Sequence, residues 1–465
     1  MSPSDLPTFT YQRQIPVDPA YDLVVVGAGP AGSAAAISAA RLGAKVLLVE
    51  GTGCAGGMGT SGLVTAFNPM ADGQRPLVGG FMRELVETLF TRGFLKPGIN
   101  PDTWRRNYEC WTPFNAEGLK LVLDEKLVEA GVEVRYFSKV VDCHLERPGC
   151  LAGVVLHNIE GLRYVPARTF VDASGDAVLA HLAGAPCREA GRDSLRIMPA
   201  TLCSLFSGVD FNQKDFKKTY QKLYKEALDE GGMFSQYDRQ LVGLDRVGTQ
   251  VGFLNGGHMF NLNALRVASL TAGVMQGRRL AQEFLRFFRE RVPGCEKIEH
   301  VTTASLIGVR ESRRIIGEYE LGREDYLARR QFADQIAVYN NAIDIHPYDC
   351  SDEQYNRFYN EYMQSGRLGE GECFGVPYGV IVPRGMANLW VAGRCVSTDV
   401  GVHGALRVQP AASMLGQAAG TAAVQALRDG ATAAEVDTRR LVTTLRDAGA
   451  ILPQPDLAAR LTRRA

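Results

Sequence analysis

The sequence predicts an α/β fold in which a parallel sheet carries helices and an α+β segment is inserted between two parts of the sheet domain. Two observations favour this fold. Residues 21–50 read as a buried strand, a glycine-rich turn, a helix and a second buried strand, which is the pattern of a parallel βαβ unit. A similar strand, turn and helix return at 388–423, after a long stretch with fewer apolar runs.

The composition is typical of a soluble globular protein, with 46% hydrophobic and 22% charged residues. Lys and Arg total 51, as do Asp and Glu, and this balance argues against a nucleic-acid-binding or anionic-membrane surface. The first twenty residues hold no signal-peptide core, and no run is apolar enough to span a membrane. We therefore expect a soluble, cytoplasmic protein.

The first unit has the spacing of a dinucleotide-binding turn. Leu23–Val26 is a short buried strand, and Gly27, Gly29 and Gly32 follow it with GxGxxG spacing. The first glycine permits the tight turn, the second lets a pyrophosphate approach the backbone, and the third lets helix and strand pack closely. Glu50 ends the next strand, where a carboxylate accepts hydrogen bonds from ribose hydroxyls. The pattern predicts a Rossmann-like dinucleotide site.

Residues 51–62, GTGCAGGMGTSG, follow this acid directly. Glycine this dense lets backbone N–H groups approach a ligand, and Gly56, Gly57 and Thr60 are the expected contacts. A loop in this place passes the ribityl chain and the ring of a flavin, which favours FAD over NAD. Cys54 invites a redox interpretation, but the ten cysteines form no CxxC pair and no metal-site cluster. We therefore expect free thiols and no metal.

Later segments of the sequence are expected to contribute further contacts to the same cofactor. Residues 119–137 show a helical period followed by a strand, and Val140 and Val141 continue it where such folds pass the adenine. Strand–turn–strand material at 154–177 ends in small residues at Ala173, Ser174 and Gly175. Near the C-terminus, Leu389–Ala392 is a buried strand, Gly393 and Arg394 form a turn, and a small-residue helix begins at Pro410. Its N-terminal N–H groups can stabilise negative charge on a reduced flavin.

Together these stretches resemble the FAD-dependent oxidoreductase family related to fumarate-reductase and glutathione-reductase flavoproteins. The resemblance covers nearly the whole chain. It rests on GAGPAG, the Gly56-Gly57 loop, DASGD, NLWVAGR, AIDIH at 342–346 and VPYGVIVP at 376–383, and most specifically on GVRESRRIIGEY from 308 and the final RVQPAASMLGQAAG. It implies FAD, redox chemistry and a Rossmann-like FAD-binding domain of the glutathione-reductase type.

The expected domain organisation is discontinuous. The FAD-binding domain takes residues 18–200 and 375–430, an α+β substrate or cap domain takes 201–374, and a helical tail takes 431–465. Within the cap domain, 212–230 and 265–291 are helical candidates. The expected cofactor contacts are Gly27, Gly29, Pro30, Ala31, Gly32, Glu50, Gly51, Gly56, Gly57, Thr60, Val140, Val141, Ala173, Ser174, Gly175, Gly393, Arg394, Ala411, Ala412, Met414 and Leu415.

The absence of several motifs narrows the mechanism, and the mechanism in turn indicates which residues are candidates for catalysis. It has no second GxGxxG after a strand to hold NAD(P)H, and Cys54 has no partner for a redox disulfide. Aromatic hydroxylases carry glycine–aspartate where this chain has Gly393-Arg394. Direct hydride exchange between substrate and flavin is therefore the simplest mechanism. It needs a proton-handling group and cations; His403, His346 and Tyr378 are candidates for the first, and Arg310 and Arg407 for the second.

The sequence thus predicts a FAD-dependent dehydrogenase or oxidase that exchanges a hydride between a small organic substrate and flavin N5, with O2 or a redox partner as electron acceptor. Reduction of a polarised C=C bond uses the same geometry. One alternative is a flavin monooxygenase supplied by external NAD(P)H or a partner reductase. Another is a flavin-binding redox scaffold without turnover. The substrate and the oligomeric state stay open.

Overall fold

The core of the protein is a seven-stranded sheet, seen in a computed structural model that describes residues 8–106, 111–194, 196–241 and 243–453. Four strands lie parallel in the order β5-β2-β1-β8, and β19 pairs in parallel with the other edge of β8. The first half of β8 instead pairs antiparallel with β7, which pairs with β6. The bounds are β1 Tyr21–Val26, β2 Val46–Val49, β5 Glu133–Arg135, β6 Lys139–Arg147, β7 Cys150–Asn158, β8 Gly161–Asp172 and β19 Leu389–Val391.

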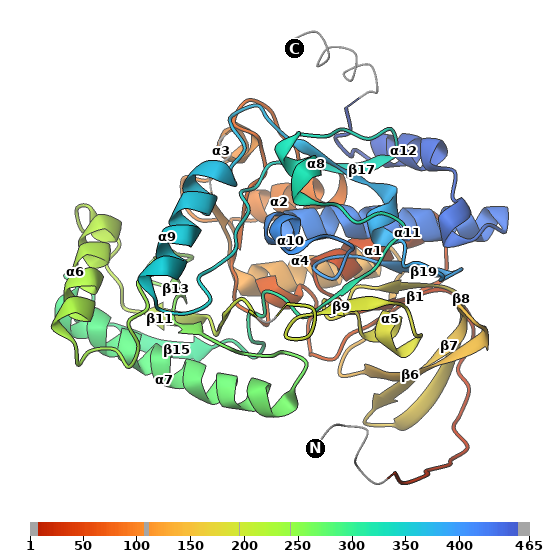
Figure 1. The fold of residues 1–465 in the computed structure, drawn as a ribbon, viewed down its shortest axis with the longest axis horizontal. Helices are drawn as coiled ribbons and strands as arrows, with labels where there is room; N and C mark the ends of the chain where they lie inside the picture. Colours follow the sequence, from red (N-terminus) through yellow and green to blue (C-terminus); the bar gives the residue numbers. More distant parts are fainter. Residues whose placement is uncertain (1–7, 107–110, 195, 242, 454–465) are drawn as a thin grey trace.

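Helices cover one face of this sheet, and β6 and β7 project from the other (Figure 1). Alternating strand and helix, with apolar residues on both faces of β1 and β2, produce the parallel order. The mixed α/β fold with a parallel sheet core is confirmed, whereas its glutathione-reductase subtype stays a prediction. The covering helices are α1 Pro30–Arg41, α2 Gly80–Thr91, α4 Ala116–Glu129, α11 Gln409–Asp429 and α12 Thr438–Asp447.

Helices α1 and α11 pack with their backbones almost in contact. A Cβ atom on Gly416 would lie 2.0 Å from the carbonyl oxygen of Ala31, and one on Gly420 would lie 2.2 Å from that of Ala35. Both glycines lie in α11 one turn apart, so they form a groove that receives the backbone of α1. This contact joins the N-terminal and C-terminal parts of the chain.

The inserted segment forms a second, smaller sheet at the other end of the molecule (Figure 1). Its antiparallel order is β12-β13-β11-β15, and its core is aromatic, including Phe206, Tyr220 and Phe284. The two helical candidates are confirmed as α6 Phe216–Glu230 and α7 Val267–Arg291. The strands are β11 Ser204–Ser207, β12 Gly243–Arg246, β13 Gly252–Asn255 and β15 Glu299–Thr303, and a separate pair joins β10 Ala200–Thr201 to β14 His258–Met259.

No described residue of 321–374 belongs to this aromatic core. Tyr326 and Tyr339 belong instead to the cluster that contains α1 and α11, and β17 (Gln335–Tyr339) pairs with β18 (Phe374–Pro377). The sequence-derived domain bounds stay a prediction, and the last part of the expected tail, 454–465, lies outside the described residues. The other elements are β3 Ala66–Phe67, β4 Thr112–Pro113, β9 Cys187–Glu189, β16 Arg313–Ile315, α3 Pro101–Arg106, α5 Val178–Leu182, α8 Arg323–Leu327, α9 Asp352–Asn360 and α10 Val400–Leu406.

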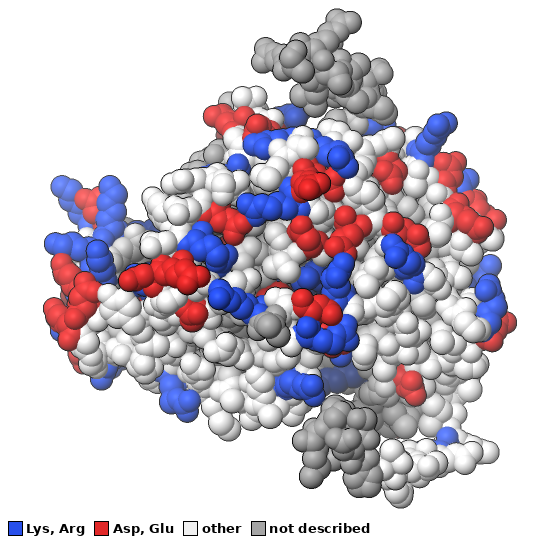
Figure 2. Space-filling model, in the orientation of Figure 1, with Lys and Arg blue, Asp and Glu red and all other residues white. Residues whose placement is uncertain are grey.

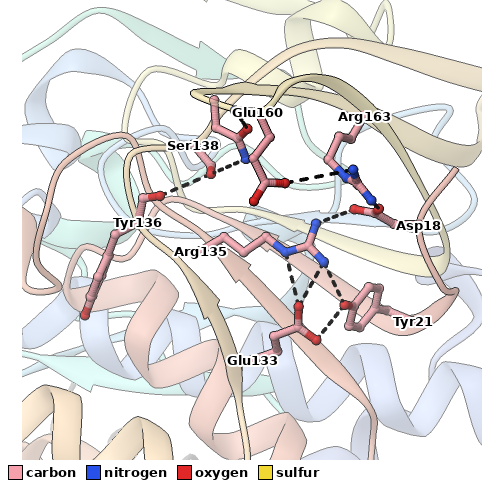
Figure 3. Close-up of polar contacts among 9 residues, drawn as sticks. Asp18, Tyr21, Glu133, Arg135, Tyr136, Ser138, Glu160 and Arg163 are labelled. Carbon is pink, nitrogen blue, oxygen red and sulfur yellow. Dashed lines mark hydrogen bonds and ion pairs between the residues drawn. The ribbon is translucent and has the colours of Figure 1, made fainter. Parts of the chain in front are cut away.

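Charged groups fasten the edge of the main sheet. Asp18, just before β1, accepts hydrogen bonds from Arg135 of β5 and Arg163 of β8, and Tyr21 donates to Glu133 at 2.6 Å (Figure 3). Burial alone would raise the pKa of Asp18, but the two guanidinium groups lower it below its ordinary value. Acidic and basic side chains are interspersed over the face shown in Figure 2. Among the described helices, none has the length and apolar character needed to cross a bilayer.

The close contact between α1 and α11 leads to a stability prediction. In Gly416→Ala, the new methyl group meets backbone atoms, which cannot move aside as a side chain can. We expect the free energy of unfolding, measured by urea denaturation, to fall by about 1–3 kcal/mol. Gly369→Ala is the control, because this exposed loop glycine has ordinary contacts of 3.4 Å or more around its Cβ position. Equal stabilities for the two variants would contradict the packing described.

Candidate functional site

The glycine-rich turn after β1 is tightly packed around two of its glycines, Gly27 and Gly32, and has free space around the third, Gly29. Gly27 has φ +92°, and a Cβ there would lie 2.7 Å from the carbonyl oxygen of Ala173. A Cβ on Gly32 would lie 1.7 Å from the carbonyl oxygen of Gly27. Around Gly29, in contrast, no heavy atom lies within 4 Å of the Cβ position. The turn thus packs tightly everywhere except at the glycine assigned to a pyrophosphate.

Helix α1 begins at this open place. Gly29 is its N-cap residue, no side chain caps the helix, and Pro30 is its first residue. The N–H groups of the first turn, from Ala31 onward, therefore have no side-chain partner, and the helix dipole makes this end favourable for anions. The free space and the uncapped helix end fit a diphosphate group.

Glu50 is held at the end of β2 by two backbone groups. Its Oε2 accepts a hydrogen bond from the N–H of Ala28 at 2.8 Å, and its Oε1 accepts one from Thr52 at 2.8 Å. Each carboxylate oxygen keeps further acceptor capacity, so ribose hydroxyls remain possible donors. Gly51 lies beside the side chain of Lys139, at the start of β6. In β6, Val140 pairs with Leu156, and the ladder is irregular at the next residue, exposed Val141.

The loop 51–62 crosses the start of α1. Gly56 and Gly57 have φ of +100° and +51°, and the N–H of Gly56 donates to the carbonyl of Ala28 at 2.8 Å. Thr60 is buried and donates to the carbonyl of Ala55 at 2.7 Å, so its hydroxyl fixes the loop from inside. Cys54 is a free thiol 3.3 Å from the hydroxyl of Ser61. The redox-disulfide interpretation of Cys54 has no support in the described residues.

The ends of β8 and β19 form the second wall. Ala173 follows β8, and Ser174 donates its N–H and hydroxyl to buried Asp172, whose pKa is raised by burial. Gly393 follows β19 with φ +90°. Arg394 donates to Asp176 at 2.6 Å and lies against Gly175. The predicted turns thus lie side by side at the carboxyl ends of neighbouring parallel strands, where α/β sheets bind ligands.

Helix α11 directs its N-terminus to the same region. Its N-cap, Val408, provides no side-chain hydrogen bond. Gln409 donates its amide N–H to the carbonyl of Val64 at 2.7 Å, while its Oε1 is buried without a partner. Four of the next residues, predicted as cofactor contacts, are small or apolar and buried: Ala411, Ala412, Met414 and Leu415.

A cavity of about 570 Å³ extends from this helix end into the inserted segment. Met58, Val408 and Gln409 line it on the side of the predicted cofactor loops. Leu241 and Phe358 are among its apolar walls on the opposite side. The polar and charged lining includes Asn68, Thr201, Gln240, Asn255, Arg310, Asn341, Asp344, His346, Arg394 and Arg407.

Three arginines line this cavity, and two of them have a carboxylate partner. Arg394 pairs with Asp176, and Arg407 pairs with Asp344 at 2.8 Å. Arg310, only 7% exposed, donates to the carbonyl of Pro199 and to the hydroxyl of Thr201 but forms no ion pair among the described residues. Burial lowers the pKa of Arg310 to about 10, and the charge of Arg407 adds to the effect.

His346 and Asp344 lie together on the cavity wall. The Nε2 of His346 is 3.3 Å from the Oδ1 of Asp344, and its Nδ1 is 2.8 Å from the Nε2 of His258. Burial, together with the charge of Arg310, lowers the pKa of His346 to about 3. Burial would raise the pKa of Asp344, but His346 and Arg407 lower it below its ordinary value.

The other two candidates for proton handling do not line the cavity. His403 is fully buried and its Nε2 lies 2.9 Å from the carbonyl oxygen of Arg310, so it supports the backbone of that residue. The hydroxyl of Tyr378 donates to the carbonyl of Ala433 at 2.7 Å and accepts from the indole of Trp390 at 2.7 Å. This geometry does not support the hypothesis that either side chain exchanges a proton with a substrate in the cavity.

Sequence reasoning missed three acidic or histidine side chains. Asp344 had a signal, because it stands two residues from His346 in an extended segment and such side chains share one side. His258, and Asp238 with a carboxylate oxygen 3.1 Å from the Nδ1 of His258, had none, since they reach the site only through tertiary packing. No group of three His, Cys, Asp or Glu side chains within the described part of the chain can hold a metal ion.

Comparison with known proteins adds a family and several relatives. A sequence profile described as FAD dependent oxidoreductase matches residues 22–445. Digeranylgeranylglycerophospholipid reductase 2 from Methanopyrus kandleri is 32% identical over 162 residues, which is 33% of this chain and 37% of that protein. The match therefore spans well under two thirds of this relative.

Solved structures are similar over most of the chain. A geranylgeranyl bacteriochlorophyll reductase-like protein from Thermoplasma acidophilum has 14% identity over 92% of this chain and 82% of its own, with TM-score 0.47. The p-nitrophenol 4-monooxygenase PnpA from Pseudomonas putida has 12% identity, 95% and 92% coverage, and TM-score 0.44. The flavin-dependent brominase Bmp2 has 15% identity, 92% and 83% coverage, and TM-score 0.43. The names of these proteins refer to different reactions, so they specify none for this chain.

The open space at Gly29 allows a sharp test of the cofactor site. Asp and Asn both suit the N-cap geometry there, but only Asp places a negative charge against a diphosphate. We expect both variants to fold, and Gly29→Asp to bind FAD at least about tenfold more weakly than Gly29→Asn, a difference of about 1.4 kcal/mol. Titration of each apoprotein with FAD, followed by flavin fluorescence, measures this. Equal affinities would contradict a diphosphate at this helix end.

Proposed function

The chain belongs to the FAD dependent oxidoreductase family, and we propose that it exchanges a hydride between a small organic substrate and the bound flavin. The observation that carries the proposal is the cavity, which joins the N-terminus of α11 and the loop at Met58 to a wall with Arg310, Asp344 and His346. A substrate there lies beside the predicted flavin position and beside charged groups at once.

The residues that would hold FAD form a continuous surface. The space at Gly29 and the start of α1 suit the diphosphate, Glu50 suits the ribose, and the uncapped start of α11 suits the electron-rich edge of the ring. When bound, FAD supplies a two-electron centre that accepts or gives up a hydride at flavin N5. These positions also support the glutathione-reductase subtype of the fold.

The cavity lining favours a substrate with an apolar body and an anionic end. Aromatic side chains, including Phe358 and Tyr362, line one side, and the guanidinium of Arg310, which has no ion pair with any described residue, lies on another. A buried cation without a carboxylate partner is costly, so a carboxylate substrate would supply the missing charge and form charge-assisted hydrogen bonds. Arg407 is less available, because Asp344 already binds it.

The proton that accompanies the hydride would pass through His346 and Asp344. Oxidation of a C–H/O–H or C–H/N–H group releases one hydride and one proton, and reduction of a polarised C=C bond takes up both. Asp344 retains 22% side-chain exposure and lines the cavity, so its carboxylate can meet a substrate proton while His346 holds it in place. The reductase name of the Methanopyrus relative is compatible with the reductive direction.

Anaerobic mixing of the purified holoprotein with candidate substrates tests the proposal. The panel contains hydroxy, amino and α,β-unsaturated carboxylic acids, each paired with its neutral amide; the saturated acids are added to oxidised flavin and the unsaturated acids to dithionite-reduced flavin. We expect a carboxylate, and not its amide, to bleach the oxidised flavin or to reoxidise the reduced one. Rapid bleaching by NAD(P)H with no response to any organic acid would contradict hydride exchange and favour a monooxygenase.

Arg310 is the residue on which the anionic substrate depends. Arg310→Gln should reduce the apparent affinity or rate for the active carboxylate by about tenfold to a hundredfold, the contribution of a hydrogen bond to a charged group. The control is Arg188→Gln, which removes a surface guanidinium paired with Glu320. Flavin reduction rates measured by stopped flow compare the two. A change of similar size in both variants would contradict the role of Arg310.

A further inference from the structure

His258 and His346 form the centre of a buried row of hydrogen-bonding groups. The Nδ1 of His258 lies 3.1 Å from a carboxylate oxygen of Asp238, its Nε2 lies 2.8 Å from the Nδ1 of His346, and the Nε2 of His346 lies 3.3 Å from Asp344. Both imidazoles are almost fully buried. The row thus runs from carboxylate to carboxylate through two rings, and its Asp344 end lies on the cavity wall.

Counting protons along this row shows that two neutral rings cannot satisfy it. A carboxylate only accepts hydrogen bonds, so each outer contact needs an N–H on the histidine that faces it. The contact between the rings needs a third N–H. Two neutral imidazoles carry only two, and the third proton gives the pair one positive charge. Leaving it out would set a nitrogen lone pair against a carboxylate or another lone pair inside the protein, which is unfavourable.

The surroundings decide which ring holds the charge. Asp238 is buried and also accepts hydrogen bonds from the hydroxyl of Tyr355 at 2.6 Å and from the backbone N–H of His258 at 3.0 Å. His258 lowers the pKa of Asp238 below its ordinary value despite burial. His346 faces the cation of Arg310, which disfavours a second positive charge there. The titratable and charged groups around the pair are Asp238, Tyr355 and Tyr224 on one side and Asp344, Arg407 and Arg310 on the other. Arg357 also lies beside His346 and donates to its backbone carbonyl at 3.0 Å.

We propose that His258 and His346 together store one proton for the reaction in the cavity, with His258 as a positioning residue and Asp344 as the exit. This rests on the proposed function. In the reductive direction, the Nε2 proton of His346 passes to Asp344 and from there to the substrate carbon. His346 then takes the Nε2 proton of His258, and the pair changes from three N–H protons to two. Oxidation runs the same transfers backwards, so protons and charge balance.

The location of the histidine pair supports a role in proton transfer, in addition to holding two segments of the chain together. His258 belongs to β14 and stands opposite Thr201 of β10 in the register, and Thr201 in turn accepts a hydrogen bond from Arg310. His346 belongs to a loop packed on the main core. Beyond Asp238, which is itself buried, Arg239 pairs with exposed Asp352. Reprotonation of the pair therefore uses its Asp344 end, which lies on the cavity wall.

The charge of the pair can be read directly by 15N NMR of the holoprotein labelled at histidine. An imidazolium gives two similar nitrogen shifts, whereas a neutral ring gives two widely separated ones. We expect one doubly protonated ring at pH 7.5, assigned by its loss in His258→Gln and by its retention in His157→Gln, which changes an exposed histidine. Should His258→Gln not fold, His346→Gln serves for the assignment. Two neutral buried rings would overturn the proposal.

The pH dependence of substrate-driven flavin turnover tests the use of this proton. We expect His258→Gln to lower kcat about tenfold to a hundredfold, less than the loss of a full acid–base group, to leave KM nearly unchanged, and to shift the pH profile; His157→Gln should match the wild type. If NMR shows a charged histidine pair but the pH profile of turnover is unchanged in His258→Gln, the proposal that the pair stores a proton for the reaction would be overturned. Failure of the proposed function is distinguishable, because no organic acid then changes the flavin of the wild type whatever the NMR shows.

Discussion

The site depends on the close contact between α1 and α11. Gly416 and Gly420 let the two helix backbones meet, and the contact includes Ala31 in the first turn of α1. It therefore fixes the two uncapped N-termini relative to each other, although hundreds of residues separate them in the chain. A diphosphate at one end and a flavin ring at the other need this spacing, and neither helix alone provides it.

Near these two helix ends, some of the arginines that line the cavity have a carboxylate partner and one has none among the described residues. Arg394 and Arg407 are neutralised by Asp176 and Asp344, whereas Arg310 is buried and has no carboxylate partner in the part of the chain that the structure describes. Arg310 therefore leaves an excess of positive charge on the cavity wall, and the charged histidine pair that we propose lies against Asp238. Such fixed charges act strongly in a low-dielectric environment, which explains why an anionic substrate and a proton store suit the same cavity.

Much of the cofactor site could be predicted from the sequence, because its parts are local. Gly27, Gly29, Gly32 and Glu50 follow from one strand–turn–helix pattern, and the small residues after Pro410 follow from another. The cavity chemistry could not be predicted in the same way. His258 meets His346 across 88 residues, and sequence position could not show that Tyr378 binds Ala433 and Trp390 or that His403 supports Arg310 from behind.

A crystal structure of the protein with FAD tests the central claim most directly. The account predicts the diphosphate against Gly29 and the first turn of α1, the flavin ring at the start of α11, and the face of the ring open to the cavity that contains Arg310. A structure with the ring turned away from this cavity, or with the diphosphate distant from α1, would contradict it.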